Sequence, residues 1–160
     1  MVEFRLINVG ISDLNTGGEN DILRTILGSC VGVCLYDKYN LIGGLSHILL
    51  PENRGKEFMP KKYADTAIPM LIKAMAEYGA NPKTLTAKLV GGARMFPFAS
   101  ALTISEIGDN NIKKAREILN NLNINIIAED VGGDFGRTMD FFINDGIVRV
   151  RSSARPEKII

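Results

Sequence analysis

The chain has 160 residues and a mass of 17.5 kDa, so residues 1–160 are expected to form a single domain with one core. Hydrophobic residues make up 46% and charged residues 23%, which excludes disordered, collagen-like and coiled-coil classes. The 19 Lys and Arg residues nearly balance the 18 Asp and Glu residues, and a net charge of +1 argues against generic nucleic-acid binding.

No apolar stretch approaches the roughly 20 residues that a membrane span needs, and the start, MVEFRLINVG, shows no signal-peptide pattern. We therefore expect a cytoplasmic protein without membrane insertion. The two cysteines, Cys30 and Cys34, agree with a reducing compartment. On one strand they would lie roughly 13 Å apart, too far for a disulfide.

The first part of the chain predicts three strands. Val2–Asn8 alternates partly, and Val31–Tyr36 and Leu41–Leu50 are rich in Val, Ile and Leu. Between the last two, Tyr36–Asn40 is typical of a hairpin turn. The irregular stretch Pro51–Lys62 follows, and loops of that length are often functional. Its basic residues would suit an acidic partner; they are Arg54, Lys56, Lys61 and Lys62.

A helix follows this loop. Apolar residues recur at three- and four-residue steps from Ala64 to Tyr78, and Gly79 ends the pattern. Asp65 or Thr66 is the expected N-cap. Pro69 fits only the first turn of a helix, which favours a start near Thr66 or a local kink.

The second half predicts strands around one more helix. The helical stripe begins near an expected cap at Asp109 and ends within Asn120–Asn125. Its apolar members are Ile112, Ala115, Leu119 and Leu122. The predicted strands are Leu85–Val90, Ile124–Glu129, Thr138–Ile143 and Ile147–Val150, the last two joined by the turn signal Asn144-Asp145-Gly146. About eight strands and two helices predict an α+β fold: a layered sandwich of mixed or antiparallel β-sheets with flanking helices.

One cysteine and the single histidine are the candidate catalytic pair. Cys30 follows Ser29 at a break before Val31–Tyr36, where backbone N–H groups can face a developing oxyanion. If the two neighbouring strands form a hairpin, Cys30 and His47 lie near its open end and meet when their faces agree. They would then form a thiolate–imidazolium pair. Cys34 is interpreted as a core residue. The alternative that Cys30 and His47 are packing residues and form no site stays open at this point.

Two other features carry less weight. Gly91-Gly92 resembles the start of a phosphate loop, but no Gly-Lys-Ser/Thr follows, so a tight turn is the better interpretation. Glu129-Asp130 at a strand end is a possible metal-ligand or acid–base pair without a second cluster to support it.

Five motifs, in order along the chain, resemble the CheD family of chemoreceptor glutamine deamidases. They are Thr25–Val31, Leu45–Pro51, Lys62–Ala67, Val90–Phe96 and Ala128–Gly133. The resemblance extends from about residue 7 to residue 150. Five motifs in register are far more specific than any one of them alone.

The resemblance implies a cysteine hydrolase that converts particular glutamine side chains of methyl-accepting chemotaxis receptors to glutamate. Some members also hydrolyse receptor glutamate methyl esters. Cys30 takes the position of the nucleophile and His47 that of the general base, with backbone N–H groups around Ser29 and Cys30 as oxyanion donors. No metal or organic cofactor is implied. The family's fold is shared with deamidating toxins of the cytotoxic necrotizing factor type, and its usual partner is the phosphatase CheC.

One position departs from the family. Its third catalytic residue is a threonine six positions before the cysteine, where this chain has Arg24, and Thr25 comes one residue later. A one-residue slip on a strand turns a side chain to the other face, and a bulge that shifts the register would let Thr25 serve as the third catalytic residue. Two rival interpretations remain: a module that binds CheC or receptors with little catalysis, and a thiol hydrolase of another protein.

Overall fold

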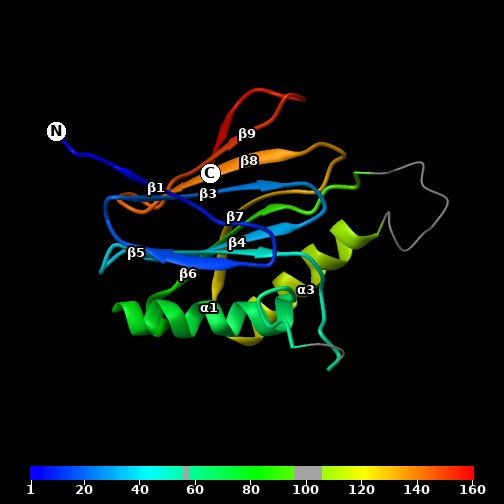
Figure 1. Ribbon diagram of the computed structural model, residues 1–160, viewed down its shortest axis with the longest axis horizontal. Helices are drawn as coiled ribbons and strands as arrows, with labels where there is room; N and C mark the ends of the chain where they lie inside the picture. The colour runs from blue at the N-terminus through cyan, green and yellow to red at the C-terminus, as the bar shows by residue number, and fades with distance from the viewer. Residues whose placement is uncertain (56–57, 96–105) are drawn as a thin grey trace.

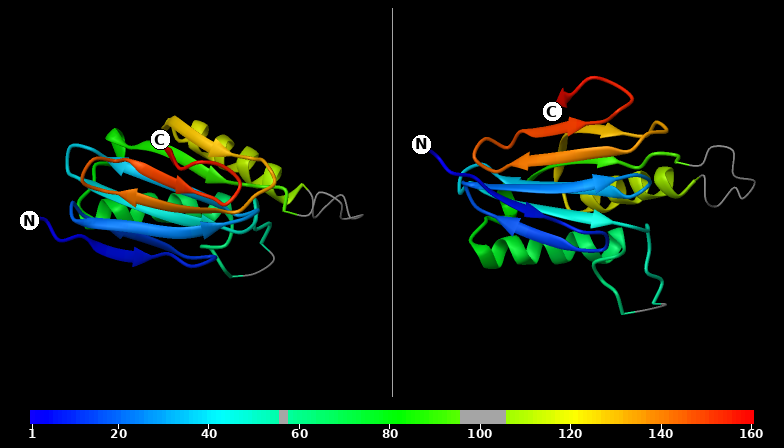
Figure 2. Two further views of the ribbon diagram at one scale, coloured as in Figure 1. Left: turned by 90° about the horizontal axis from the view of Figure 1, so that it is seen from above. Right: turned by 45° about the horizontal axis from the view of Figure 1, so that its top comes forward.

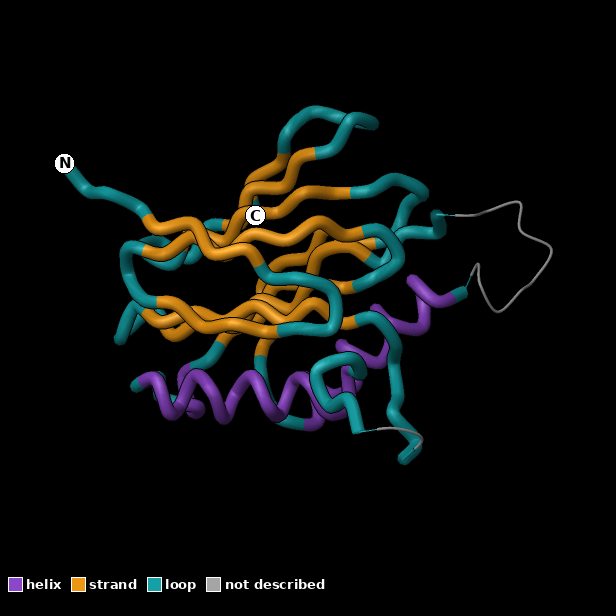
Figure 3. The backbone as a smooth tube through the Cα atoms, in the orientation of Figure 1, coloured by secondary structure: helices purple, strands orange, loops and turns teal. Residues whose placement is uncertain are grey.

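The computed structural model describes residues 1–55, 58–95 and 106–160. Within them, two five-stranded sheets face each other, and two helices cover the outer face of one sheet (Figure 1). Both helices lie on the same side of the strands in the tube view (Figure 3). The molecule therefore has three layers, sheet A, sheet B and the helices, which the rotated views also show (Figure 2).

Each sheet is made of strands from distant parts of the chain. Sheet A runs in the order β1 (Arg5–Asn8), β3 (Asp21–Leu27), β8 (Arg137–Phe142), β9 (Val148–Arg151) and β10 (Lys158–Ile159). Sheet B runs in the order β2 (Leu14–Gly17), β5 (Ile42–Ile48), β4 (Val31–Asp37), β6 (Thr86–Gly91) and β7 (Asn125–Val131). The helices are α1 (Ala64–Tyr78), α3 (Ile107–Asn121) and the short 3-10 helix η1 (Pro82–Thr84).

Sheet B is the middle layer, and its strands β4 and β5 are buried on both faces. Alternate residues of β4 belong to different cores: Val31, Val33 and Leu35 pack toward the helices, while Cys34 and Tyr36 pack toward sheet A. Double burial explains why β4 and β5 are continuous runs of apolar and small residues. The space between the two sheets is therefore lined mainly by buried apolar side chains.

The predicted mixed α+β sandwich is confirmed, with more strands than expected. β4 and β5 pair antiparallel across their turn, and β8 and β9 pair antiparallel across theirs. Sequence analysis missed β2, β3 and the two-residue β10. β2 is short and polar, and β3 was overlooked because its inward side includes Asp21 and Thr25.

The expected helix starts are wrong by a few residues. α1 begins at Ala64, so Pro69 lies inside it, and its N-cap Tyr63 makes no side-chain cap. Asp65 instead accepts the N–H of Asn53 at 3.1 Å, and the Thr66 hydroxyl donates to the Pro60 carbonyl at 2.6 Å. Both polar side chains thus secure the preceding loop.

The second helix shows a similar difference. α3 begins at Ile107 after Glu106, and Asp109 lies in its first turn, where its carboxylate pairs with Arg94. None of the helices in the described ranges is long and apolar enough to cross a membrane.

Candidate active site

Thr25, and not Arg24, faces the interior between the sheets. Leu23, Thr25 and Leu27 are the buried alternate residues of β3, while Arg24 pairs on the opposite face with Asp140 at 2.6 Å. The bulge invoked in the sequence argument is absent, because residues 22–27 pair in unbroken register with residues 137–142. Thr25 points inward through ordinary strand alternation.

The Thr25 hydroxyl meets His47 across the two sheets. Its Oγ1 lies 2.7 Å from His47 Nδ1 and donates its hydrogen to the carbonyl of Val9 at 2.6 Å. A hydroxyl has one hydrogen, so toward His47 it can only accept a hydrogen bond. Nδ1 must therefore carry the ring proton, which leaves Nε2 with its lone pair.

Within the described residues, Nε2 of His47 is the unpartnered nitrogen of the ring. The residue is 2% exposed, and Nε2 is buried without a hydrogen-bond partner among the described residues. The backbone of His47 is fixed on the other side, because its N–H donates to Asp13 O and its carbonyl accepts from Ser12 N. The ring is thus held firmly while its second nitrogen stays available.

Cys30 lies on the same face of sheet B as His47. Gly32 pairs with His47 across β4 and β5, and Cys30 precedes Gly32 by two residues, so both side chains lie on one face. Cys30 is a free thiol in the apolar cluster between the sheets. The two side chains therefore share a face, but no hydrogen bond joins the Cys30 thiol to His47 among the described residues.

The turn that carries Cys30 rests on the Gly91-Gly92 segment. Gly92 N donates to the Cys30 carbonyl at 2.8 Å, and Ala93 N donates to the Gly28 carbonyl at 3.0 Å. Gly91 has a φ of 102°, and a Cβ there would overlap the Cys30 carbonyl oxygen. The expected tight turn is not found, because Gly91 ends β6 and no turn directly follows it within the described residues; the glycine pair instead lies against the backbone of the Cys30 segment.

Burial keeps both candidate groups neutral. It raises the pKa of the Cys30 thiol to about 11 and lowers the pKa of the His47 imidazole to about 4. At neutral pH the free protein therefore holds a neutral Cys30 thiol and a neutral His47 imidazole. Burial of both groups disfavours the preformed thiolate–imidazolium pair predicted from the sequence.

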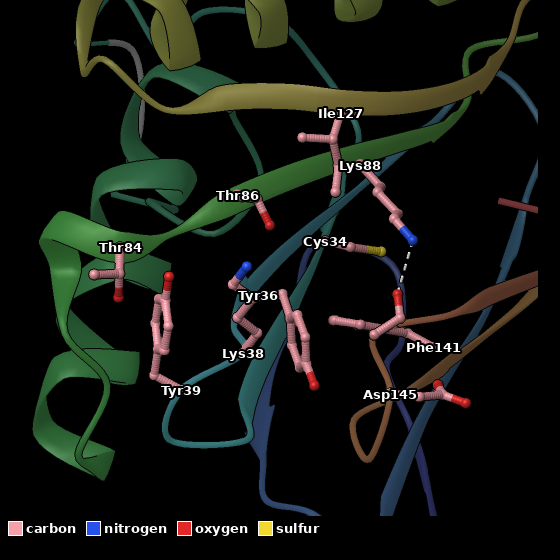
Figure 4. A pocket seen from close by; sticks show the side chains of 11 residues that line it. Cys34, Tyr36, Lys38, Tyr39, Thr84, Thr86, Lys88, Ile127, Phe141 and Asp145 are labelled. Atoms are coloured by element: carbon pink, nitrogen blue, oxygen red, sulfur yellow. Dashed lines mark hydrogen bonds between the residues drawn. The ribbon is translucent and has the colours of Figure 1, made fainter.

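Cys34 takes no part in this site. It lines a separate cavity of about 500 Å³ near the C-terminal end of β4, together with Tyr36, Tyr39 and Lys88 (Figure 4). Burial raises the pKa of Cys34 far above that of an ordinary thiol. The interpretation of Cys34 as a packing residue agrees with its position.

The loop after β5 is less cationic than its sequence suggested. Arg54 pairs with Glu52 at 3.0 Å and Lys61 pairs with Asp13 at 3.4 Å, while Lys56 lies outside the described residues. Phe58 is 96% exposed, and Met59 beside it is also exposed. The described part of this loop therefore offers apolar side chains rather than free positive charge.

Glu129 and Asp130 are engaged in ion pairs. Glu129 pairs with Arg116, and Asp130 pairs with the buried Arg137 at 3.2 Å. No group of three or more His, Cys, Asp and Glu side chains that could hold a metal ion occurs within the described ranges. The two carboxylates have a structural explanation in these pairs.

Comparison with known proteins gives two kinds of match. The family model described as CheD chemotactic sensory transduction matches residues 49–152, a segment that begins just after His47. A probable chemoreceptor glutamine deamidase CheD of Clostridium kluyveri is 45% identical over 154 residues, covering 94% of this chain and 95% of that protein. A protein of the same description from Clostridium botulinum (strain Hall) is 44% identical over 154 residues, with the same coverage.

A solved structure supports the fold. The Neisseria meningitidis protein NMB0706, of the DUF152 family, superimposes with a TM-score of 0.54 at 12% identity, covering 89% of this chain and 71% of that one. At this identity the likeness concerns the fold alone, and the expected similarity to deamidating toxins stays a prediction. The family match and the two relatives are decisive together: the chain belongs to the CheD family of chemotactic sensory transduction proteins.

Proposed function

We propose that this protein is a chemoreceptor glutamine deamidase that uses Cys30 as nucleophile and His47 as general base. The observation that carries the proposal is the unpartnered Nε2 of His47, held by Thr25 on the face that also bears Cys30. Relatives that align over 94% of the chain are described as probable chemoreceptor glutamine deamidases. We expect it to act in the cytoplasm, without a metal or organic cofactor.

The first half of the reaction forms a thioester. His47 Nε2 takes the proton of the Cys30 thiol as the sulfur attacks the side-chain carbonyl carbon of a receptor glutamine. The C=O bond opens to an oxyanion that accepts hydrogen bonds from backbone N–H groups around Ser29 and Cys30, worth about 3 kcal/mol per good donor. The C–N bond then breaks, His47 returns its proton to the departing nitrogen, and ammonia leaves.

Water completes the second half. His47 removes a proton from a water molecule, whose oxygen attacks the thioester carbon. The C–S bond breaks, the Cys30 sulfur regains its proton, and the product is a glutamate side chain. A glutamate methyl ester would follow the same path with methanol as the leaving group. Thr25 contributes by keeping the proton on Nδ1 throughout.

The loop after β5 supports recognition of a protein substrate. Phe58 and Met59 are apolar side chains exposed on a loop whose base begins two residues after β5, the strand of His47. Its base is closed by hydrogen bonds from Leu49 N and Leu50 N to the Lys62 carbonyl, so its attachment to the site is firm. We infer that these apolar side chains contact a receptor helix.

The test is peptide mass spectrometry of a chemoreceptor cytoplasmic fragment incubated with wild type, Cys30→Ala and Cys34→Ala. Site-specific conversion of glutamine to glutamate by wild type and Cys34→Ala, but not by Cys30→Ala, is the expected result. A parallel incubation with a methylated fragment compares release of methanol with release of ammonia. Equal conversion by wild type and Cys30→Ala would remove this thiol from the mechanism.

Two outcomes would favour the rival functions. Receptor or CheC binding by wild type without any conversion would make the chain a binding module. Capture of a different protein by Cys30→Ala, with no action on receptors, would indicate a thiol hydrolase of another target. Co-purification with a CheC phosphatase tests the partner that the family resemblance predicts.

A further inference from the structure

Asn111 is a fully buried polar residue on α3. It is 0% exposed and lies on the helix face that also carries Ile112, Ala115 and Leu119. Its Nδ2 donates to the carbonyl of Ser29 at 3.1 Å and to the carbonyl of Leu49 at 3.0 Å. Two carbonyl oxygens only accept, so they fix which end of the amide faces them.

These two carbonyls belong to the segments that bear the candidate catalytic groups. Ser29 directly precedes Cys30, and Leu49 follows His47 by two residues. The ladder between β4 and β5 ends at the pair Val31 and Ile48, so both segments lie just beyond it. Asn111 spans the gap where the ladder no longer holds them together.

The bond to Ser29 also sets the direction of the next N–H group. No cis peptide occurs among the described residues, and in a trans peptide the C=O and N–H groups point in opposite directions. Because the Ser29 oxygen points to α3, the Cys30 N–H points away from α3. The backbone of Cys30 also interacts with the thiol of the same residue, since it lowers the thiol pKa against the larger effect of burial.

Packing alone gives a poor account of this amide. Its Oδ1 is buried and has no hydrogen-bond partner within the described residues, a cost that an apolar side chain would avoid. The helix also approaches unusually closely, since a Cβ on Gly108 would lie 2.5 Å from the carbonyl oxygens of Gly92 and Ala93. That approach brings Asn111 to the nucleophile turn.

We propose that Asn111 is a positioning residue that holds the Ser29–Cys30 peptide so that the Cys30 N–H faces the oxyanion during acyl transfer. The inference takes its receptor substrate from the proposed function, whereas the hydrogen bonds of Asn111 come from the structure alone. Asn111 acts through the backbone and does not touch the substrate. Its loss should therefore slow reactions that build an oxyanion at Cys30 and spare those that do not.

The test compares two reactions of the same thiol. Acylation, measured as receptor deamidation and as reaction with p-nitrophenyl acetate, builds an oxyanion, whereas alkylation by iodoacetamide does not. Asn111→Leu and the smaller Asn111→Ser are compared with Asn110→Leu and Asn110→Ser, because Asn110 is the exposed neighbour on the same helix. Cys30→Ala supplies the background, and thermal unfolding identifies folded variants.

The Asn111 variants should acylate at least tenfold more slowly, with KM for the receptor within about twofold, against the 10²–10³-fold typical of losing an oxyanion donor outright. Their alkylation rate should stay within about threefold of wild type. Equal loss in both reactions would reduce Asn111 to a packing residue. Unchanged acylation, a similar loss in the Asn110 variants, or wild-type acylation no faster than Cys30→Ala would overturn the inference. Ester acylation without receptor deamidation would refute the proposed substrate and still measure the role of Asn111.

Discussion

The Thr25 hydroxyl lies 2.7 Å from Nδ1 of His47, and this contact joins a strand of sheet A to a strand of sheet B. The hydrogen of Thr25 is committed to the Val9 carbonyl, so the imidazole must be the donor in the Thr25–His47 bond. A neutral hydroxyl thus sets the tautomer of the base, a task that a carboxylate performs in the Ser-His-Asp triad.

Replacing Thr25 by Val should impair catalysis more than stability. Valine keeps the shape but leaves the Nδ1 proton without an acceptor. We expect kcat for deamidation to fall about 10- to 100-fold, less than most of the roughly 10²–10⁴-fold that general acid–base catalysis contributes, because His47 itself remains. The unfolding free energy should fall by about 1–3 kcal/mol in urea titrations. Thr25→Ser, which keeps the hydroxyl, is the control, and equal activity of the two variants would contradict the assigned role.

The single histidine makes the tautomer directly measurable. Nitrogen-15 NMR of the imidazole should show protonated Nδ1 and unprotonated Nε2 at pH 7, because Thr25 accepts from Nδ1. Burial lowers the pKa of His47 to about 4, so the ring should titrate well below the ordinary value of 6.5. Titration near 6.5 in the folded protein would show that the imidazole is solvated.

The same shift links stability to pH. The unfolded chain binds a proton at His47 below about pH 6.5, whereas the folded chain resists protonation until about pH 4. The contribution of this group is therefore complete above pH 6.5 and is lost as the pH falls toward 4, at up to about 1.4 kcal/mol per pH unit. The difference in unfolding free energy between wild type and His47→Gln, measured in urea at each pH, isolates the contribution of His47. Unfolding free energies that change in parallel with pH in the two proteins would refute it.

Cys30 should alkylate slowly at neutral pH. Burial raises its pKa to about 11, so its reaction with iodoacetamide should keep accelerating up to that region. Measurements on Cys34→Ala remove the other thiol from the signal. A plateau already reached near pH 7 would instead reveal the thiolate–imidazolium pair that the sequence alone suggested.

The hairpin was predictable because its signals are local. An apolar run, a turn at residues 36–40 and a second apolar run suffice to place Cys30 and His47 near one end on one face. The charge states were not predictable, because they depend on sheet A covering that face. Thr25 illustrates the same limit: the chain leaves sheet A after Leu27 and enters sheet B at Val31, so a crossing loop, and not a strand register, separates it from Cys30.

One feature of the sequence marks Asn111. It lies four residues before Ala115 and eight before Leu119, which places a polar amide on the buried stripe of a helix. A polar residue in such a position requires partners, and a search for them would have pointed to carbonyls at a site. Which carbonyls it bonds could come only from the fold, since Ser29 and Leu49 are 82 and 62 residues away.

Gly91→Ala should disturb Cys30 from a distance in sequence. The φ of 102° is strained for alanine, and the new Cβ would overlap the Cys30 carbonyl oxygen. We expect a loss of at least about 1–3 kcal/mol in unfolding free energy and a larger relative loss of deamidation. Gly10→Ala is the matched control, because a Cβ there meets nothing within 4 Å. Equal losses of stability and deamidation in the two variants would show that Gly91 does not support the Cys30 segment.

Because Thr25 sits on one sheet while Cys30 and His47 sit on the other, the chemistry depends on how two separately hydrogen-bonded halves are seated. A sliding of one half over the other by about 1 Å would break the imidazole's anchor and leave the thiol in place. A partner that binds the outer face of sheet A and shifts this sheet would therefore inhibit the reaction without contacting Cys30 or His47.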